Sequence, residues 1–293
     1  MCVDYRQINK KVVRDKFPTP NVEEQIDQLS EARVYTTLDL KNSYFHVAIE
    51  ESSRKYTSFV TNDGQYEFLR APFGLCTSGN AFGRFISAVL KDLVKDGKVI
   101  AFVDDDIIPS KNEQEGIELL KTVLKVAEEA GLYFSWKKCA FLQRRVEYLG
   151  YTIYDGCIKP APAKVEKLKQ FPQPTTVKEL QRFYGLASYF RKFIPAFASI
   201  ARPLSGMLRK ESCFDFDADA VAAFNRIKEI LTSYPVLRIF CPGAETEVHT
   251  DASKVALAGI LMQRAKDDVG SGRVFEKVSM LLVGLQVQDC DGL

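Results

Sequence analysis

The chain has 293 residues, of which 46% are hydrophobic and 27% charged, and its formal net charge is only +2. These values are ordinary for a globular protein, and the charge balance alone does not mark a nucleic-acid binder, so basic clusters must be sought locally. No run of about eighteen apolar residues predicts a membrane span, and the seven cysteines form no CxxC pair typical of structural zinc sites. The first residues lack the apolar stretch of a signal peptide, so we expect reduced thiols in an intracellular protein of the cytoplasm or nucleus.

The first half of the chain mixes helical and strand patterns. Asn21 and Gly131 are typical residues at the start and end of helices, and Asn62-Asp63-Gly64 is a strong hairpin signal. This mixture predicts an α+β fold, with helices inserted between antiparallel hairpins. The predicted elements are helices over 20–32, 80–94 and 112–132, a strand over 33–40, a hairpin over 54–74, a strand–turn–strand unit over 99–110 and two short strands over 137–153.

The composition changes after Pro160. Prolines separate three helical stretches within 161–208, because proline interrupts the hydrogen bonding of a helix. A further helix is predicted over 218–232, and a strand-like pattern follows over 246–263. The chain therefore divides into a mixed first part, a helical middle and a smaller third part.

Three consecutive aspartates interrupt the apolar stretch "AFVDDDIIPS" at 101–110, and Asp39 ends the strand over 33–40. Adjacent carboxylates repel one another, so they lie either on an exposed turn or around a bound cation. An acid at a strand end plus an acidic turn suits Mg²⁺, which takes oxygen ligands and is held by one or two carboxylates. Taken alone, these acids are somewhat more typical of an acidic surface turn and an unrelated strand-end aspartate than of a Mg²⁺ site.

The residues that flank these acids favour the metal site over the surface turn. Five motifs occur in order, and together they resemble the reverse transcriptase of gypsy-class LTR retrotransposons and their retroviral relatives. The resemblance continues through 159–204 and 222–237 to "HTDAS" at 249–253, and it covers the chain up to about Gln263. The five motifs are "VDYRQIN" (3–9), "TTLDLKNSYFHVAI" (36–49), "YEFLRAPFGL" (66–75), "AFVDDDII" (101–108) and "VEYLGYTI" (146–153).

The resemblance implies an α+β fold, a right-hand polymerase of fingers, palm and thumb, followed by a partial RNase H-like α/β unit. Residues 1–155 would hold incomplete fingers and the palm, 156–208 a helical thumb, and 209–293 a partial RNase H-like domain with a divergent tail. The implied activity is RNA-directed DNA synthesis, with two Mg²⁺ ions that Mn²⁺ could replace. The implied partners are an RNA template, a DNA primer and deoxynucleoside triphosphates, with no membrane and no indicated oligomeric state.

The resemblance also implies roles for single residues, carried over from matching motif positions. Tyr44 would exclude a 2′-hydroxyl, although an ordinary core position stays open for it. The implied site residues are Asp39, Asp104 and Asp105 as catalytic and metal-binding acids, Leu40 as a backbone metal ligand, Tyr44, Phe73 and Gly74 at the nucleotide, Arg6, Lys138, Leu149 and Gly150 at the template and primer, and Asp251 as the first acid of an RNase H remnant.

Several positions depart from the family pattern. Asp106 stands where the family has an apolar residue, and Gly79, Asn80 and Gly83 differ at the start of the predicted palm helix. The basic finger residues that bind the triphosphate lie upstream of "VDYR" in the family, and the tail over 273–293 does not resemble the family's continuation. We therefore expect a polymerase core truncated at both ends, without RNase H activity. The alternative is a remnant that keeps the fold and at most binds nucleic acid.

Overall fold

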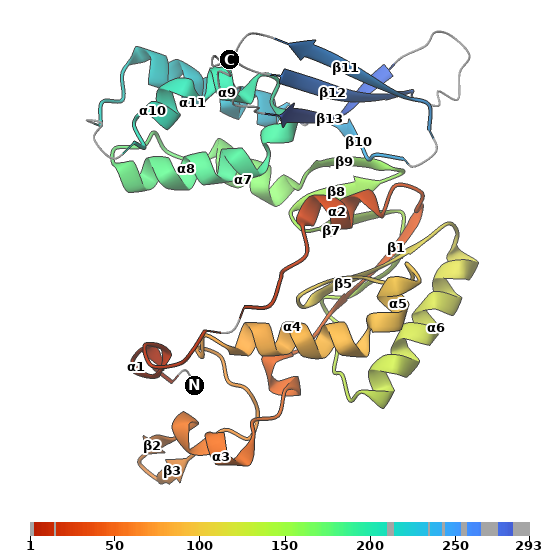
Figure 1. Cartoon of the computed structure of the whole chain (residues 1–293), viewed down its shortest axis with the longest axis vertical. Coiled ribbons are helices and arrows are strands. Elements are labelled where there is room, and N and C mark those ends of the chain that lie inside the picture. The colour runs from red at the N-terminus through yellow and green to blue at the C-terminus, as the bar shows by residue number, and fades with distance from the viewer. Residues whose placement is uncertain are drawn as a thin grey trace, which may run out of the picture. The chain divides into compact units, whose positions relative to one another are not determined.

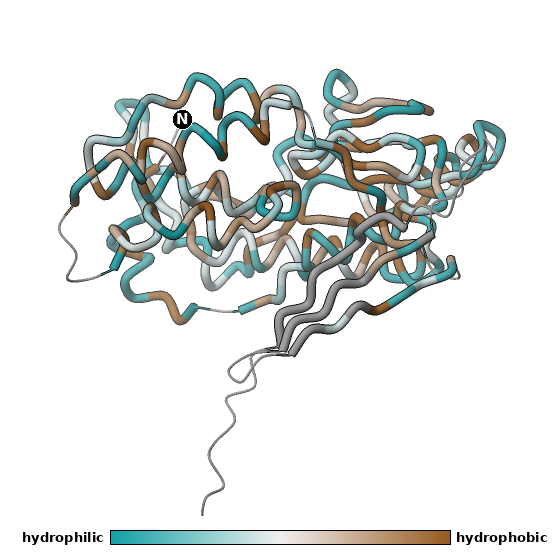
Figure 2. Tube along the Cα trace, turned by 90° about the horizontal axis from the view of Figure 1, so that it is seen from above, coloured by the Kyte–Doolittle hydropathy of each residue, from teal (hydrophilic) through white to brown (hydrophobic). Residues whose placement is uncertain are grey.

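The computed structural model describes residues 3–14, 16–209, 214–233, 235–241, 244–252, 257–264 and 275–283 (Figure 1). The chain divides into two compact units, Met1–Leu149 and Gly150–Leu293. Within the described residues, no helix is both long and apolar enough to cross a membrane. The helices change repeatedly between hydrophilic and hydrophobic residues along their turns (Figure 2), which is typical of helices with one buried face.

The first unit combines a small antiparallel sheet with helices, as predicted. Its helices are α1 (Arg6–Asn9), α2 (Val22–Asp27), α3 (Glu51–Arg54), α4 (Ser78–Val89), α5 (Lys91–Lys95) and α6 (Glu113–Glu129), with 3₁₀ turns η1 (Ser43–His46) and η2 (Lys55–Thr57). Its strands are β1 (Val34–Asp39), β2 (Phe59–Thr61), β3 (Gly64–Tyr66), β4 (Ile100–Phe102), β5 (Asp105–Ser110), β6 (Ala140–Gln143) and β7 (Arg145–Tyr148).

The central sheet of this unit has the strand order β4-β5-β1-β6, and β1 runs antiparallel to both neighbours. Helices α4 and α6 lie beside these strands (Figure 1), and their apolar faces share one core with β1 and β5. That core contains Leu38 of β1, Phe82 of α4, Ile108 of β5 and Val123 of α6. The core fixes β1 and β5 side by side, so the polar ends of the two strands are held on a rigid base.

Local sequence signals explain where the main helices begin. Asn21 accepts a hydrogen bond from the amide of Glu23 at the start of α2, and Asn112 accepts one from Glu115 at the start of α6. Gly131 follows α6 with φ +66°, a left-handed conformation that glycine adopts without steric cost. The predicted hairpin is also confirmed, since Thr61 pairs with Gly64 across a two-residue turn.

Two expectations need correction in this unit. The helix predicted over 80–94 is divided into α4 and α5, because Leu90 leaves the helical conformation at φ −93° and ψ +6° while staying buried. The residues 137–153 form three strands rather than two, with β6 and β7 in the first unit and β8 (Tyr151–Tyr154) beginning the second. In both cases the packing of apolar residues determines where the elements end, and hydrophobic spacing alone does not show the break.

The second unit contains a group of helices and two small sheets. Its helices are α7 (Pro162–Lys169), α8 (Val177–Tyr189), α9 (Phe197–Ile200), α10 (Arg202–Gly206) and α11 (Ala218–Thr232), with the 3₁₀ turn η3 (Arg191–Phe193). Its strands are β8, β9 (Cys157–Pro160), β10 (Leu237–Arg238), β11 (Thr246–Ala252), β12 (Leu257–Arg264) and β13 (Phe275–Val283).

Aromatic packing joins these helices. The rings of Phe183 on α8 and Phe224 on α11 lie 4.5 Å apart, and Phe171 contacts Phe183 at 5.5 Å. The helix predicted over 218–232 matches α11, whereas the third of the three helical stretches predicted over 161–208 is broken into α9 and α10. The third part forms an antiparallel sheet in the order β11-β12-β13, so strand structure extends beyond the predicted pattern over 246–263.

Candidate polymerase site

Three of the predicted site acids converge where β1 meets the β4–β5 turn. Asp39 is the last residue of β1, and it lies opposite Asp105, the first residue of β5. The amide of Leu40 donates a hydrogen bond of 3.4 Å to the carbonyl of Asp104, which brings the turn against the strand end. The antiparallel register therefore places the acids of two distant motifs side by side.

The turn that carries these acids is strained. Phe102 pairs with Asp105, so Val103 and Asp104 alone make the reversal between β4 and β5. Val103 has φ +61°, a conformation that a β-branched side chain adopts at a steric cost. Such strain persists only where the surrounding structure enforces it, and it is frequent at functional turns. Here the ladder between β1 and β5 supplies that constraint.

The electrostatics of this turn favour a bound cation. The pKa of Asp105 is raised first by burial, then by the charges of Asp104 and Asp39, whereas Lys138 lowers it. Repulsion among the three acids means that a positive charge placed between them would stabilise their ionised forms. The structure supplies one such charge in the form of the Lys138 ammonium.

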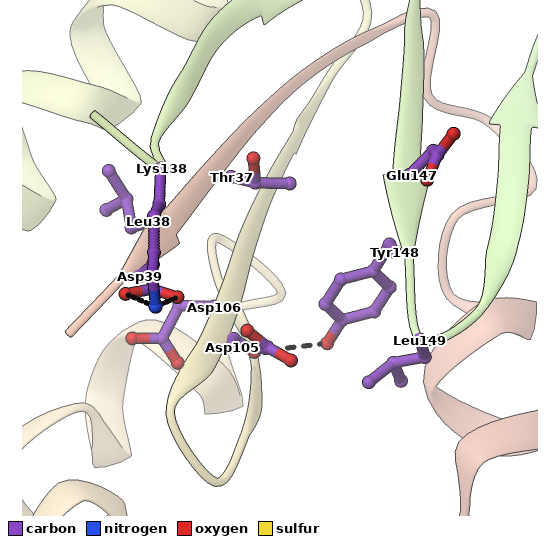
Figure 3. Close-up of a pocket in the computed structure, with 9 residues that line it drawn as sticks. All are labelled: Thr37, Leu38, Asp39, Asp105, Asp106, Lys138, Glu147, Tyr148 and Leu149. Atoms are coloured by element: carbon purple, nitrogen blue, oxygen red, sulfur yellow. Dashed lines mark hydrogen bonds and ion pairs between the residues drawn. The ribbon is translucent and has the colours of Figure 1, made fainter. Parts of the chain in front are cut away.

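Lys138 binds Asp39 directly. Its Nζ donates to both carboxylate oxygens of Asp39, at 3.2 and 3.1 Å (Figure 3). The pair borders a cavity of about 110 Å³, and the residues of β7 line the side opposite Lys138. The lining residues are Thr37, Leu38, Asp39, Asp105, Asp106, Lys138, Glu147, Tyr148 and Leu149.

Asp106 differs from its neighbours because it is buried. The residue is only 3% exposed, it pairs with Leu38 in the sheet, and its Oδ1 has no hydrogen-bond partner within the described structure. Burial, followed by the charges of Asp105 and Asp104, raises the pKa of Asp106 to about 8. The returning strand β5 therefore buries this departure from the family pattern.

Two cavity residues, Glu147 and Tyr148, were missed by the sequence analysis. The Tyr148 hydroxyl donates a hydrogen bond of 3.4 Å to the carbonyl of Asp105. Burial and the charges of Asp106 and Asp105 raise the pKa of this hydroxyl, so it stays a donor. The alternation of buried and exposed residues along β7 shows two faces, but which face meets β1 depends on the tertiary structure.

The predicted nucleotide residues gather around η1, which follows Asp39. The rings of Tyr44 and Phe73 lie 4.9 Å apart, and Tyr44 also contacts Phe82 of α4 at 6.1 Å. A Cβ placed on Gly79 would lie 3.6 Å from the Tyr44 hydroxyl oxygen. Tyr44 is thus a half-buried ring between the acid-bearing strand and α4, next to the predicted nucleotide loop.

A histidine that the sequence analysis did not assign anchors η1. The Nδ1 atom of His46 lies 3.0 Å from the carbonyl of Ser43, and its Nε2 lies 3.0 Å from the amide nitrogen of Tyr133. Because the Tyr133 amide is a donor, Nε2 accepts and the ring proton lies on Nδ1. The 133–138 segment, which carries Lys138, is thereby joined to the turn that carries Tyr44.

The first motif lies against the predicted nucleotide loop. Asn9 donates through Nδ2 to the carbonyl of Gly74 and accepts through Oδ1 from the amide of Cys76. Gly74 has φ +97°, and a Cβ on it would lie 3.4 Å from the Tyr5 ring. These contacts bring the segment of Arg6 next to Gly74, two sites that are 68 positions apart in the sequence.

The other predicted site residues lie elsewhere. Arg6 forms an exposed ion pair of 2.6 Å with Asp4, whose pKa its hydrogen bonds lower to about 2. Leu149 lines the cavity, whereas Gly150 belongs to the second unit. Asp251 is on β11, with its side chain outside the described residues. The structure therefore brings together Asp39, Asp104, Asp105, Lys138 and Leu149, and separately Tyr44, Phe73 and Gly74.

The donor chemistry of the acid site fits a hard divalent cation. Among the residues that the structure describes, no three His, Cys, Asp or Glu side chains are already arranged around one point. Carboxylates from two adjacent strands nevertheless meet there, and their repulsion is offset by an ammonium on Asp39. Carboxylate oxygens that attract a cation in this way are the ligands that Mg²⁺ prefers.

Comparison with known proteins decides the family. Residues 1–153 match the family described as reverse transcriptase (RNA-dependent DNA polymerase). The chain belongs to the reverse transcriptase family. Residues 216–275 match an RNase H-like domain found in reverse transcriptases, so the resemblance extends beyond the limit near Gln263 that the sequence analysis expected.

Related reverse transcriptases occur in Pol polyproteins of transposons. The chain is 34% identical over 279 residues to that of transposon gypsy from Drosophila melanogaster, covering 91% of this chain and 27% of that protein. It is 35% identical over 294 residues to that of transposon opus from the same organism, covering 96% and 29%. The Schizosaccharomyces pombe Tf2-3 polyprotein is 33% identical over 268 residues, covering 92% and 20%. The chain thus spans less than a third of each of these relatives.

Solved structures show the same fold. The foamy viral protease–reverse transcriptase dRH in complex with double-stranded DNA has a TM-score of 0.81 at 24% identity, covering 96% of this chain and 48% of that one. The foamy viral protease–reverse transcriptase in complex with an RNA/DNA hybrid has a TM-score of 0.76 at 24% identity, covering 96% and 37%. The expected α+β polymerase fold followed by an RNase H-like unit is confirmed.

Proposed function

We propose that this chain is the polymerase core of a gypsy-class Pol protein, and that it transfers deoxynucleotides to the 3′-hydroxyl of a primer on an RNA or DNA template. The observation that carries the proposal is the register of β1 and β5, which sets Asp39 beside Asp105 with Asp104 in the intervening turn. A family match alone would not require these acids to meet. Their meeting is what catalysis requires, and it supports the proposal because a remnant that had lost one of these acids would not show it.

In this proposal Asp39, Asp104 and Asp105 hold two Mg²⁺ ions, with the Leu40 carbonyl as a further ligand. The chemistry supplied by the bound ions would be activation of the primer hydroxyl and stabilisation of the pyrophosphate that leaves. The chain itself provides adjacent carboxylates, and the bound ions would relieve the repulsion that, together with burial, raises the pKa of Asp105. Mn²⁺ has similar ligand preferences and would replace Mg²⁺.

Tyr44 and Phe73 would form the sugar side of the nucleotide site. Their rings are in contact, and Tyr44 is held from behind by Phe82 and α4. A ring that cannot retreat excludes a 2′-hydroxyl by steric conflict, which discriminates against ribonucleotides without strengthening the binding of deoxyribonucleotides. Gly74, fixed by Asn9, would allow the backbone to approach the incoming nucleotide.

The template and primer would contact the rest of the predicted set. Arg6 would bind the template strand, Lys138 a primer phosphate, and Leu149 with Gly150 the primer end. The partition into fingers and palm at 1–155, thumb at 156–208 and RNase H-like remnant at 209–293 belongs to the same proposal. Basic side chains that contact phosphates set position and register but carry no sequence information, so template choice would not depend on them.

The proposal is tested by primer extension with the 293-residue chain, a labelled primer on an RNA template, deoxynucleotides and Mg²⁺. We expect extension that requires Mg²⁺ and is lost in Asp104→Asn, because an amide does not offset the charge of the bound cations. Duplex binding, measured by fluorescence anisotropy, stays within about twofold in this variant, since it depends on phosphate contacts. Binding without any extension by the unmodified chain would favour the alternative of a nucleic-acid-binding remnant.

A further inference from the structure

Lys138 occupies a built position rather than a random place on the surface. The amide of Ser135 donates to the carbonyl of Asp39 at 2.8 Å, and the Asp39 amide donates to Sγ of Cys139 at 3.5 Å. The amide of Lys138 in turn donates to Ser135 at 2.8 Å. The backbone that carries Lys138 is therefore attached to Asp39 on both sides, which sets the ammonium over this carboxylate.

The exposures of the two partners differ strongly. The side chain of Asp39 is 23% exposed, whereas that of Lys138 is 68% exposed. Lys138 thus approaches the carboxylate from the solvent side and covers its open face. Its long aliphatic chain can swing away without disturbing any packed group, so the ion pair can open at little cost to the fold.

The ammonium and a divalent cation compete for the same oxygens. Lys138 Nζ lies at 3.2 and 3.1 Å from the two carboxylate oxygens, so it already occupies the group that would hold a cation. A Mg²⁺ ion needs its oxygen ligands at roughly 2.1 Å. Two positive groups bound to one carboxylate face would be in contact and would repel each other, so one must leave.

We propose that Lys138 is a displaceable counter-ion of the polymerase site, whose ammonium neutralises Asp39 until a divalent cation replaces it. This inference rests on the proposed function, since it assumes that Asp39 is a metal ligand. The counter-ion relieves the repulsion among Asp39, Asp104 and Asp105 before metal binds. The cost of displacing it lowers the affinity of the site for metal, so Lys138 sets the metal concentration at which the site is filled.

The inference is tested by measuring Mn²⁺ binding to the 293-residue chain, from the loss of the electron paramagnetic resonance signal of free Mn²⁺. We expect Lys138→Gln to tighten Mn²⁺ binding roughly 2- to 5-fold. This range corresponds to the free energy of an ion pair at the protein surface. Lys138→Arg keeps the charge and the contact, so its affinity should equal or fall below that of the unmodified chain.

Lys137→Gln is the matched control. It removes the same charge one residue away, where no ion pair with Asp39 is present, and should change the Mn²⁺ affinity by less than about 1.5-fold at ~0.15 M salt. Equal effects of Lys137→Gln and Lys138→Gln would overturn the inference, because they would reveal a general charge effect. So would tighter binding in Lys138→Arg.

Asp39→Asn separates failure of this inference from failure of the proposed function. Loss of Mn²⁺ binding in Asp39→Asn, together with tighter binding in Lys138→Gln, supports both. Loss in Asp39→Asn with no response to Lys138→Gln overturns the counter-ion role and leaves the metal site standing. Unchanged Mn²⁺ binding in Asp39→Asn overturns both, because the cation then binds elsewhere.

Discussion

Two strand aspartates, Asp39 in the first unit and Asp251 in the second, have very different neighbours. Asp39 lies opposite Asp105 across the β1–β5 ladder, and Lys138 covers it. Asp251 lies opposite Ala258 on β12, which in turn lies opposite Leu282 on β13. An acid at a strand becomes part of a charged site only where the adjacent strand contributes a second acid, and the register decides whether it does.

The largest expected effect is on primer extension, which should depend on Asp39 and not on Asp251. Asp39→Asn should reduce primer extension to below a few per cent, on the order of the 100-fold loss that follows removal of a charge-stabilising group. Asp251→Asn should leave extension unchanged within about twofold. Both are measured under single-turnover conditions with the 293-residue chain. Comparable losses in the two variants would break the comparison.

The same comparison predicts that the second unit does not cleave RNA. Two-metal cleavage of a phosphodiester needs several carboxylates around one point, and no acid of β12 or β13 shares the register position of Asp251. A labelled RNA strand in a hybrid should therefore stay intact during incubation with the chain and Mg²⁺. Cleavage that disappears in Asp251→Asn would contradict this prediction and show that other residues complete the site.

The next effect concerns Asp106, which lies beside the acid site in the first unit but is buried, with no hydrogen-bond partner for its Oδ1 within the described structure. Because the pKa of Asp106 is raised from 3.8 to about 8, the folded state holds a proton that the unfolded state releases. The protonated acid contributes stability that is fully present below about pH 4 and is lost as the pH rises through 8. Asp106→Ile removes the buried carboxyl group and therefore the loss of stability at high pH. The β-branched side chain of isoleucine also suits a strand.

We expect Asp106→Ile to increase the free energy of unfolding at pH 8 by about 1–3 kcal/mol, the cost of an unsatisfied buried polar group. Asp106→Asn, which is neutral and of similar size, should also flatten the pH dependence. Urea unfolding at pH 5 and pH 8 measures both, and the pH dependence of the difference from the unmodified chain isolates Asp106. Weaker Mn²⁺ binding by Asp106→Ile would instead make Asp106 a metal ligand.

Much of this arrangement could be predicted from the sequence. Apolar and β-branched runs around the acidic turn predicted β1, β4 and β5, and the family resemblance implied that Asp39, Asp104 and Asp105 belong to one site. The burial of Asp106 was not predicted, because β5 buries Asp106, Ile107 and Ile108 in succession and alternation of faces does not determine which acid points inward. Local pattern was sufficient for the β4–β5 hairpin, whereas the meeting of Asp39 with Asp105 across β1 and β5 followed only from the family resemblance.

Contacts between distant segments could not be predicted in this way. The ion pair of Lys138 with Asp39 depends on the Ser135 and Cys139 hydrogen bonds to the Asp39 backbone. The role of His46 depends on the amide of Tyr133, 87 positions away. No periodicity in the sequence encodes such pairs, since they arise from the tertiary packing of loops whose conformations have no repeating pattern.

A smaller effect is expected at Tyr44. Tyr44→Val opens space beside Phe73, so it should raise ribonucleotide relative to deoxyribonucleotide incorporation by roughly 10-fold, the scale of one steric contact. Single-nucleotide extension with each substrate measures the ratio. Tyr133→Val is a control on a neighbouring exposed ring that does not touch Phe73 in the described contacts. An unchanged ratio in Tyr44→Val would make Tyr44 a packing residue only.

The smallest expected effect is on the free energy of unfolding, when one helix glycine in each unit is replaced by alanine. Gly185 is in the interior of α8, and a Cβ added to it would meet no atom within 4 Å. Gly83 is in the interior of α4, and its Cβ would lie 3.0 Å from Cδ1 of Phe17. Alanine gains about 0.5–1 kcal/mol over glycine in a helix, because it loses less backbone freedom on folding.

Gly185→Ala should therefore increase the free energy of unfolding by about 0.5–1 kcal/mol. In Gly83→Ala the Phe17 ring must move by a few tenths of an ångström, which offsets this gain and leaves the net change near zero. Urea unfolding of both variants measures the difference, and far-ultraviolet circular dichroism verifies that helix content is kept. Equal stabilisation would mean that Phe17 adjusts freely and that α4, despite its contact with Tyr44, is packed as loosely around Gly83 as α8 is around Gly185.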